Sequence, residues 1–308
     1  MTSARRFVLV DVFADRPLAG NPLAVFPEAE GLSDASMQAI AREMDHAATA
    51  FLFPPKMPGA AFRLRIFSRD REVPFAGHPA LGAHFVHASE SSGASAAHAP
   101  PVARAAHEID GTLVPVELSY ADGRIAMLRL TQRPSAAGSP LPADATPRAA
   151  EALGLGEEDI QAANQPLQIV STGLPVLIVP VATLAALQKA RPRYDLLRGV
   201  LEGRDTSLVY AFTKETIAAR AAAHTRAFDT GGSVEIPGAG AAAGALAAYL
   251  VANAAVTVTP VVSLVFEQGH VLDRPSTLFA EVRVKAGKVS QVVVGGRVVR
   301  VGEGVLEI

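Results

Sequence analysis

The chain has 308 residues, a formal net charge of −2 and no cysteine. This length suits two domains of about 150 residues each. The small net charge gives no reason to expect nucleic acid or an anionic membrane as a partner, and the lack of cysteine excludes disulfides, thiolate metal sites and cysteine nucleophiles. The polar start at Met1–Arg6 lacks the features of a signal peptide, so we expect a cytoplasmic protein.

The first half alternates between strand-like and helix-like segments. Ser33 is a suitable N-cap for a helix that runs to about Asp45, because Met37, Ile40 and Met44 recur at helical spacing. Alternating or apolar runs predict strands at 6–12, 23–26, 51–54, 62–68, 112–119 and 124–131. The segment 132–146 is expected to be a connection near the boundary between the halves.

Two segments of similar design are central to the chain. Residues 74–86 (PFAGHPALGAHFV) and 236–250 (IPGAGAAAGALAAYL) each place a Gly-containing turn before a helix of small apolar residues. A helix that is apolar on all faces must be buried. Its N-terminus offers free backbone N–H groups and the positive end of the helix dipole, which favour a small anionic ligand.

The second half repeats the order of elements seen in the first half. The turn glycine and the helix-start glycine are 57 residues apart in the first half (Gly20, Gly77) and 67 apart in the second (Gly173, Gly240). This order predicts a degenerate internal duplication. The uncharged run 236–266 is long enough to span a bilayer, but its change from Ala/Gly to β-branched residues predicts a buried helix followed by a buried strand, and no membrane partner.

Several motifs, spread over nearly the whole chain, resemble the phenazine-biosynthesis PhzF-like family within the diaminopimelate-epimerase-like fold. They are VDVFADRPLAGNPLAVF (10–26), IAREM (40–44), FAGHPALG (75–82), STGLP (171–175), GALAAYL (244–250) and EQGHVLDRPSTL (267–278). The resemblance implies an α+β fold of two pseudo-symmetric domains, each a curved mixed sheet around a central helix, with the active-site cleft between them. It divides the chain into 1–130 and 131–296, with 297–308 returning to the first domain.

The resemblance also implies an isomerase that needs no cofactor and no metal, and a homodimer. In such a mechanism a glutamate removes a proton from carbon, an aspartate helps to return it, and the histidine of the GHP motif, here His78, assists. The same resemblance places the glutamate at Ala48, the aspartate at Ile236 and a ligand-binding serine at Ala241. Both expected carboxylates are therefore replaced.

His78 is accordingly the main candidate for acid or base chemistry. Glu235, one residue before the position of the aspartate, and Asp45 or His46, just before Ala48, are candidates for a second group. A carboxylate-bearing ligand is expected to meet Gly77, Gly240, Ala241 and Asn21.

Two functional hypotheses remain open on the sequence. The first is an isomerase or epimerase that transfers a proton on carbon with a non-standard set of catalytic residues. The second is a catalytically lapsed member of the family that binds a small molecule or a protein. Other chemistries lack their patterns: GAGAAAG (238–244) is not followed by an acidic residue about 20 positions later, as a dinucleotide site requires, and His84 and His87 form a weak metal signal.

Overall fold

The structure is a computed structural model that describes residues 4–73, 77–91 and 100–308. The chain divides into two compact units, one of residues up to Thr131 together with Gly295–Ile308, and one of Gln132–Val294. Pro74, Phe75 and Ala76, which open the first of the two central motifs, lie outside the described residues.

In its described residues, unit 1 is a mixed sheet with two helices, and the C-terminal strand returns to it by pairing antiparallel with the first strand. Its helices are α1 (Asp34–Met44) and α2 (His78–Ser91). Its strands are β1 (Ala4–Val12), β2 (Asn21–Phe26), β3 (Thr49–Phe53), β4 (Phe62–Phe67), β5 (Val102–Ile109), β6 (Thr112–Ala121), β7 (Arg124–Thr131) and β17 (Val298–Glu307).

Unit 2 repeats this plan with more helices on the outside of its sheet. Its helices are α3 (Ala145–Leu153), α4 (Glu157–Gln161), α5 (Leu184–Lys189), α6 (Tyr194–Leu201) and α7 (Gly240–Ala252), with a short 3₁₀ turn, η2 (His270–Leu272). Its strands are β8 (Ala136–Pro140), β9 (Gln168–Ser171), β10 (Pro175–Pro180), β11 (Leu208–Thr213), β12 (Ala223–Asp229), β13 (Val234–Ile236), β14 (Val261–Gln268), β15 (Ser276–Lys285) and most of β16 (Lys288–Gly296).

The internal duplication appears in the strand pairing. From β1 to β6 the successive pairs β1–β2, β2–β3, β3–β4, β4–β5 and β5–β6 are antiparallel, parallel, antiparallel, parallel and antiparallel. The pairs β9–β10, β10–β11, β11–β12, β12–β14 and β14–β15 follow the same sequence. Parallel pairs need a crossover, and helices supply it at equivalent places, with α2 and α7 in the second crossover of each unit.

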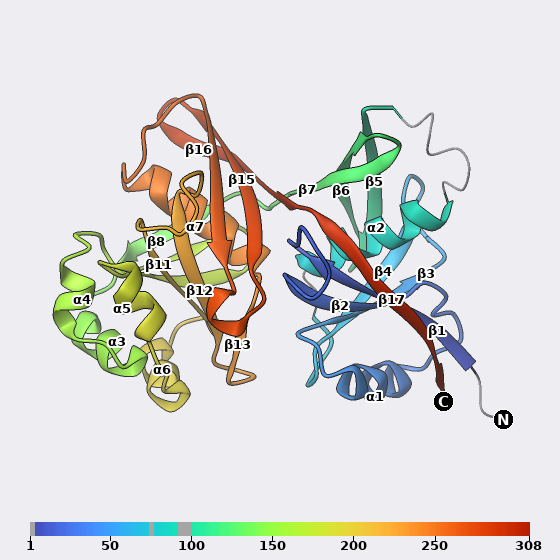
Figure 1. The fold of residues 1–308 in the computed structure, drawn as a ribbon, viewed down its shortest axis with the longest axis horizontal. Helices are drawn as coiled ribbons and strands as arrows, with labels where there is room; N and C mark the ends of the chain where they lie inside the picture. Colours follow the sequence, from blue (N-terminus) through green and yellow to red (C-terminus); the bar gives the residue numbers. More distant parts are fainter. Residues whose placement is uncertain (1–3, 74–76, 92–99) are drawn as a thin grey trace. The chain divides into compact units, whose positions relative to one another are not determined.

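Each unit is built around one of these crossover helices (Figure 1). Helix α2 packs against strands β1 to β4, β7 and β17, and α7 against β9, β10, β11, β14 and β15. A glycine is the fifth residue of both helices, and neither site has room for a side chain. A Cβ on Gly82 would lie 2.4 Å from the Leu23 side chain, and one on Gly244 would lie 1.8 Å from Gln132 Oε1. Glycine at these two positions therefore allows the Leu23 and Gln132 side chains to approach the helices closely.

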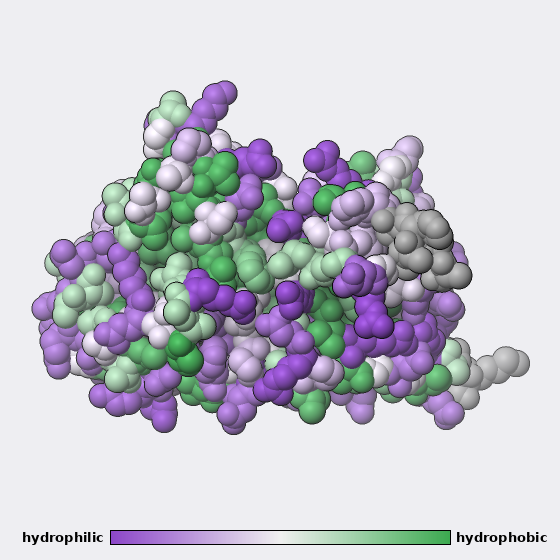
Figure 2. Space-filling view, turned by 45° about the horizontal axis from the view of Figure 1, so that its top comes forward, coloured by the Kyte–Doolittle hydropathy of each residue, from purple (hydrophilic) through white to green (hydrophobic). Residues whose placement is uncertain are grey.

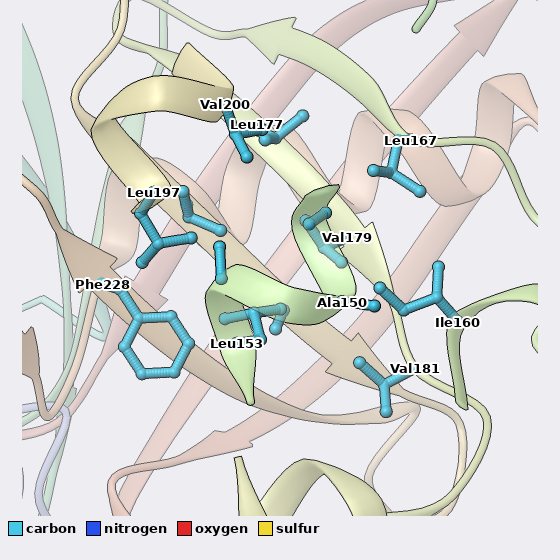
Figure 3. Packing of buried hydrophobic residues seen from close by; sticks show 14 of the residues in the cluster. Ala150, Leu153, Ile160, Leu167, Leu177, Val179, Val181, Leu197, Val200 and Phe228 are labelled. Atoms are coloured by element: carbon cyan, nitrogen blue, oxygen red, sulfur yellow. The ribbon is translucent and has the colours of Figure 1, made fainter. Parts of the chain in front are cut away.

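The outer face of each sheet is covered by amphipathic helices. In unit 2, Leu153 of α3, Leu197 of α6, Val179 of β10 and Phe228 of β12 belong to one buried cluster, which Figure 3 shows from close by. In unit 1, Met37 and Ile40 of α1 pack on the strands beneath in the same way. In the space-filling view, hydrophilic side chains cover much of the lower left surface and hydrophobic ones gather above them (Figure 2).

The structure confirms most of the predicted elements and differs from the prediction within 132–146. Helix α1 has Ser33 as its N-cap, whose hydroxyl accepts the Ser36 N–H, and Asp45 as its left-handed C-cap. The uncharged run 236–266 forms α7 and part of β14, separated by a turn. No helix among the described residues is long and apolar enough to cross a membrane. Within 132–146, expected to be a connection only, Ala136–Pro140 forms β8 on the edge of β9, where proline is tolerated.

Candidate functional site

His78 is the first residue of α2. Pro79 follows it and is tolerated in the first turn because its missing N–H would have no helical partner there. The Gly77 carbonyl accepts the Ala80 N–H at 3.2 Å, which closes the first turn. The His78 Nε2 atom is buried and has no hydrogen-bond partner among the residues that the structure describes. A buried polar atom left unpaired costs about 1–3 kcal/mol, so this nitrogen is suited to a ligand atom.

A second imidazole, that of His46, lies close enough to affect His78. Burial, with a smaller contribution from His46, lowers the pKa of His78 to about 3. His78 is therefore neutral near pH 7 and carries one N–H donor and one bare nitrogen acceptor. The fold thus places His46, from the turn between α1 and β3, near the start of α2.

Asp45 caps helix α1 and forms an ion pair with Arg69. Its backbone adopts the left-handed conformation, with a φ of 48°, and its N–H donates to the Ala41 carbonyl at the end of α1. Its carboxylate accepts a hydrogen bond from Arg69 at 2.9 Å, and the side chains of both residues are two-thirds exposed. Asp45 therefore ends the helix and takes part in a surface ion pair. Ala48, at the position where the resemblance expects a glutamate, is buried.

Glu235 is held by a buried arginine. Its two carboxylate oxygens accept hydrogen bonds from Arg226 Nε at 2.9 Å and Arg226 Nη2 at 2.7 Å. The remaining Arg226 nitrogen donates to the Leu187 and Ala190 carbonyls at the end of α5. Successive side chains of a strand point to opposite faces, so Glu235 faces α5 and the neighbouring Ile236 faces away from it.

The loop that leads from Ile236 into α7 is held by side chains from β14 and β15. Gln268 Nε2 donates to the Ile236 carbonyl at 2.6 Å, and Gln268 Oε1 accepts the Ala239 N–H at 3.2 Å. The Ser276 hydroxyl donates to the Pro237 carbonyl at 2.7 Å. Gly269 lies against this loop and has a φ of 78°. A Cβ at this position would lie 2.6 Å from the Pro237 carbonyl oxygen. These contacts fix the position of the first turn of α7.

Gly240 and Ala241 form that first turn and are both buried. Gln132 Nε2 donates to the Gly240 carbonyl at 3.1 Å, and no side chain among the described residues caps the helix at Ala239. The first N–H groups of a helix have no partner within it. The turn is thus fixed through its carbonyl and its preceding loop, while its amides point away from the helix.

Of the two remaining predicted ligand-binding residues, Gly77 is half-buried at the start of α2. Asn21 is fully buried at the first position of β2, opposite Val12 of β1. Among the described residues, no group of three or more His, Cys, Asp or Glu side chains could hold a metal ion.

The family described as "Phenazine biosynthesis-like protein" matches residues 10–304. The chain belongs to this family. It is 34% identical to an uncharacterised isomerase of Mesorhizobium japonicum, with 98% of each chain covered. It is 30% identical to the trans-2,3-dihydro-3-hydroxyanthranilate isomerase of Pseudomonas aeruginosa, covering 97% of this chain and 98% of the relative. A solved structure of a predicted epimerase from P. aeruginosa has a TM-score of 0.82 and 35% identity, with 98% and 99% covered.

Membership of the phenazine biosynthesis-like family confirms the fold and the isomerase/epimerase type predicted from the motifs. The positioning role of Gln268 was not predicted, although Gln268 lies inside the EQGHVLDRP motif. The signal available in the sequence was a glutamine at the end of a strand pattern, SLVFEQ (263–268), directly before a glycine. The partner of Glu235 could not be found in this way, because Arg226 lies in a separate strand and nothing in its local sequence marks it.

Proposed function

We propose that the chain catalyses cofactor-independent proton transfer on a carbon atom of a small carboxylate-bearing metabolite. The observation that carries the proposal is the buried Nε2 of His78 at the start of α2, which has no hydrogen-bond partner among the described residues, with His46 close enough to lower the pKa of His78. The relatives named as isomerases support the reaction class. In this proposal Gly77 and Asn21 of unit 1 and Gly240 and Ala241 of unit 2 are the candidate ligand-binding residues, and the free backbone amides at the start of each helix suit anionic groups.

The low pKa of His78 determines its role in this mechanism. A histidine with a pKa of about 3 is a weak base at neutral pH, but as a neutral imidazole it can donate its N–H to an enolate-like oxygen without delivering a full proton. His46 is then the proposed group that exchanges the carbon-bound proton. Asp45 and Glu235 are further candidates, and each would have to leave an arginine, Arg69 or Arg226, before it could act.

Deuterium exchange tests the proposal. The protein is incubated in D₂O with a panel of amino and hydroxy acids that includes trans-2,3-dihydro-3-hydroxyanthranilate, and mass spectrometry measures deuterium incorporation at carbon. We expect exchange in the wild type and a loss of about 100-fold or more in His78→Ala and in His46→Ala. Arg42→Gln, on the exposed side of α1, is the matched control. Exchange that persists in both histidine variants would contradict the proposed roles.

The second candidate function is binding without chemistry. It is favoured by the apolar residues Ala48 and Ile236 at the two expected carboxylate positions and by the arginine partners of Asp45 and Glu235. It predicts saturable binding of a carboxylate from the panel with no deuterium incorporation. In that case the double variant Ala48→Glu/Ile236→Asp is the complementary experiment, because a gain of exchange would show that only the carboxylates were lacking.

The resemblance also led us to expect a homodimer, which we retain as part of the proposal. Light scattering coupled to size-exclusion chromatography measures it directly: a mass of about twice the 32.0 kDa of the chain is expected, and a mass of one chain would refute it.

A further inference from the structure

A cavity lies within unit 1 and is lined in part by His87 of α2. It has a volume of about 570 Å³ and is lined by Arg5 from β1, the loop after β2, the end of β3 and the start of β4, and His87 from α2. Its apolar wall consists of Pro27, Ala29, Leu52, Phe53, Pro54, Pro55, Ala61 and Phe62. Small-molecule sites in proteins have this size and this mixture of apolar wall and few polar groups.

Arg5 is the charged group of this cavity. Its Nη1 donates to the Glu30 carbonyl at 3.0 Å and lies 3.5 Å from the Glu28 carbonyl. Within the described part of the chain no carboxylate pairs with Arg5, and its Nε has no hydrogen-bond partner. Main-chain oxygens thus orient the guanidinium without neutralising its charge. An arginine fixed in this way is prepared for a carboxylate, which its planar fork matches.

His87 and Phe62 form the opposite part of the cavity. The two rings lie 5.1 Å apart, centroid to centroid, and Phe62 also packs on His84 at 4.7 Å. Behind Phe62, His84 Nε2 lies 3.1 Å from His107 Nδ1 in a buried hydrogen bond. Phe62 is itself buried and is held from both α2 and β5, so this side of the cavity is rigid before any ligand arrives, and pre-formed sites lose less free energy to ordering.

We propose that this cavity binds a small monocarboxylate with a planar or apolar body. Arg5 would take the carboxylate, His87 would offer a hydrogen bond, and the body would lie on Pro54 and Pro55, the exposed part of the apolar wall. The side chains of Glu28 and Glu30 are exposed beside the cavity, and their negative charges oppose ligands that carry two or more negative charges. One guanidinium matches one carboxylate.

This site is separate from the proposed catalytic site. His87 is nine residues after His78 on the same helix, which corresponds to about 14 Å along the axis. The inference therefore goes beyond the proposed function and does not depend on it. Because His78 and His87 belong to the same helix, a ligand in the cavity would contact the helix that carries His78.

Benzoate is a suitable probe because it has one carboxylate and a flat apolar ring. In a titration of the wild type followed by amide NMR, we expect the signals of Gly31 and Ala61 to shift with a Kd on the order of 0.1–1 mM. Phthalate, with two carboxylates, should bind more weakly, and benzylamine should leave these signals unchanged. No shift with benzoate, or a larger shift with benzylamine than with benzoate, would overturn the proposal.

Variants distinguish this cavity from the site at His78. Arg5→Gln should raise the Kd for benzoate, measured from the signals of Gly31 and Ala61, by about tenfold or more. Arg5→Lys should raise the Kd less, because the charge remains while the planar guanidinium is lost. Arg42→Gln and His78→Ala should leave the Kd for benzoate unchanged. Equal affinity in Arg5→Gln and wild type would refute the site, whereas loss of deuterium exchange in His78→Ala alone concerns only the proposed function.

Discussion

Both carboxylate oxygens of Glu235 are bound by the guanidinium of Arg226, and the side chains of both residues are at least 90% buried. The remaining hydrogen bonds of Arg226 end on main-chain oxygens of α5. The pair therefore connects β12, β13 and α5, and its first consequence concerns stability.

Glu235→Ala should destabilise the protein by about 3–5 kcal/mol, because the Arg226 charge would remain buried without its counter-charge. Urea unfolding followed by circular dichroism measures the change. The control is Glu151→Ala, which removes the exposed partner of Arg193 and should cost about 1 kcal/mol or less. If Glu235→Ala were as stable as the control, the carboxylate would be available for another role.

Gln268→Leu should loosen the first turn of α7 at a cost in stability of about 2 kcal/mol or more. The substitution leaves the part-buried Ile236 carbonyl and the buried Ala239 N–H without their partner, and each unpaired group carries a desolvation penalty. Hydrogen exchange of the peptide 236–242 should accelerate by more than global destabilisation explains. Unchanged protection of that peptide would show that Ser276 and Gly269 suffice to hold the loop.

Gly82→Ala should destabilise unit 1 by about 1–3 kcal/mol, because the new methyl group would enter the space of Leu23. The matched control is Gly199→Ala on α6, where nothing lies within 4 Å of an added Cβ and alanine should stabilise the helix by about 0.5–1 kcal/mol. Opposite signs in thermal unfolding are therefore expected. A neutral Gly82→Ala would mean that α2 can move away from β1 and β2.

The buried pair His84 and His107 should make the protein less stable in acid. Burial lowers the pKa of His107 to about 4, and it also lowers that of His84, with His107 and His87 contributing. The unfolded chain, with a histidine pKa near 6.5, binds more protons than the folded chain between these values. The free energy of unfolding should therefore be highest above about pH 6.5. It should fall as the pH falls toward 4, by up to about 3 kcal/mol for His107.

Urea midpoints between pH 4 and 8 measure this effect. His107→Phe, which keeps an aromatic ring beside Phe62 and His84, should reduce the dependence of stability on pH. A slope as steep as that of the wild type would assign the acid sensitivity to other groups.

The sequence by itself determined the elements and the family. Periodicity and capping residues placed α1 between Ser33 and Asp45, and the Gly/Ala composition of 236–250 required a buried helix. The repeated order of turn and helix indicated the duplication that the strand pairing later displayed. The elements are local features, since they depend on spacing within about 15 residues, and local preferences can be read along the chain. The duplication and the family follow from the order of those elements and motifs.

Only the tertiary structure decided where the functional groups point. Glu235 contacts Arg226 because β12 pairs with β13 and because α5 packs over these strands. That His46 approaches His78, or Arg5 the same cavity as His87, follows from the packing of α2 against the sheet. These partners lie on different strands, helices or turns, and no local pattern encodes which element packs on which. They are determined by the close packing of the whole unit, in which buried charges and imidazoles are stable only beside suitable partners.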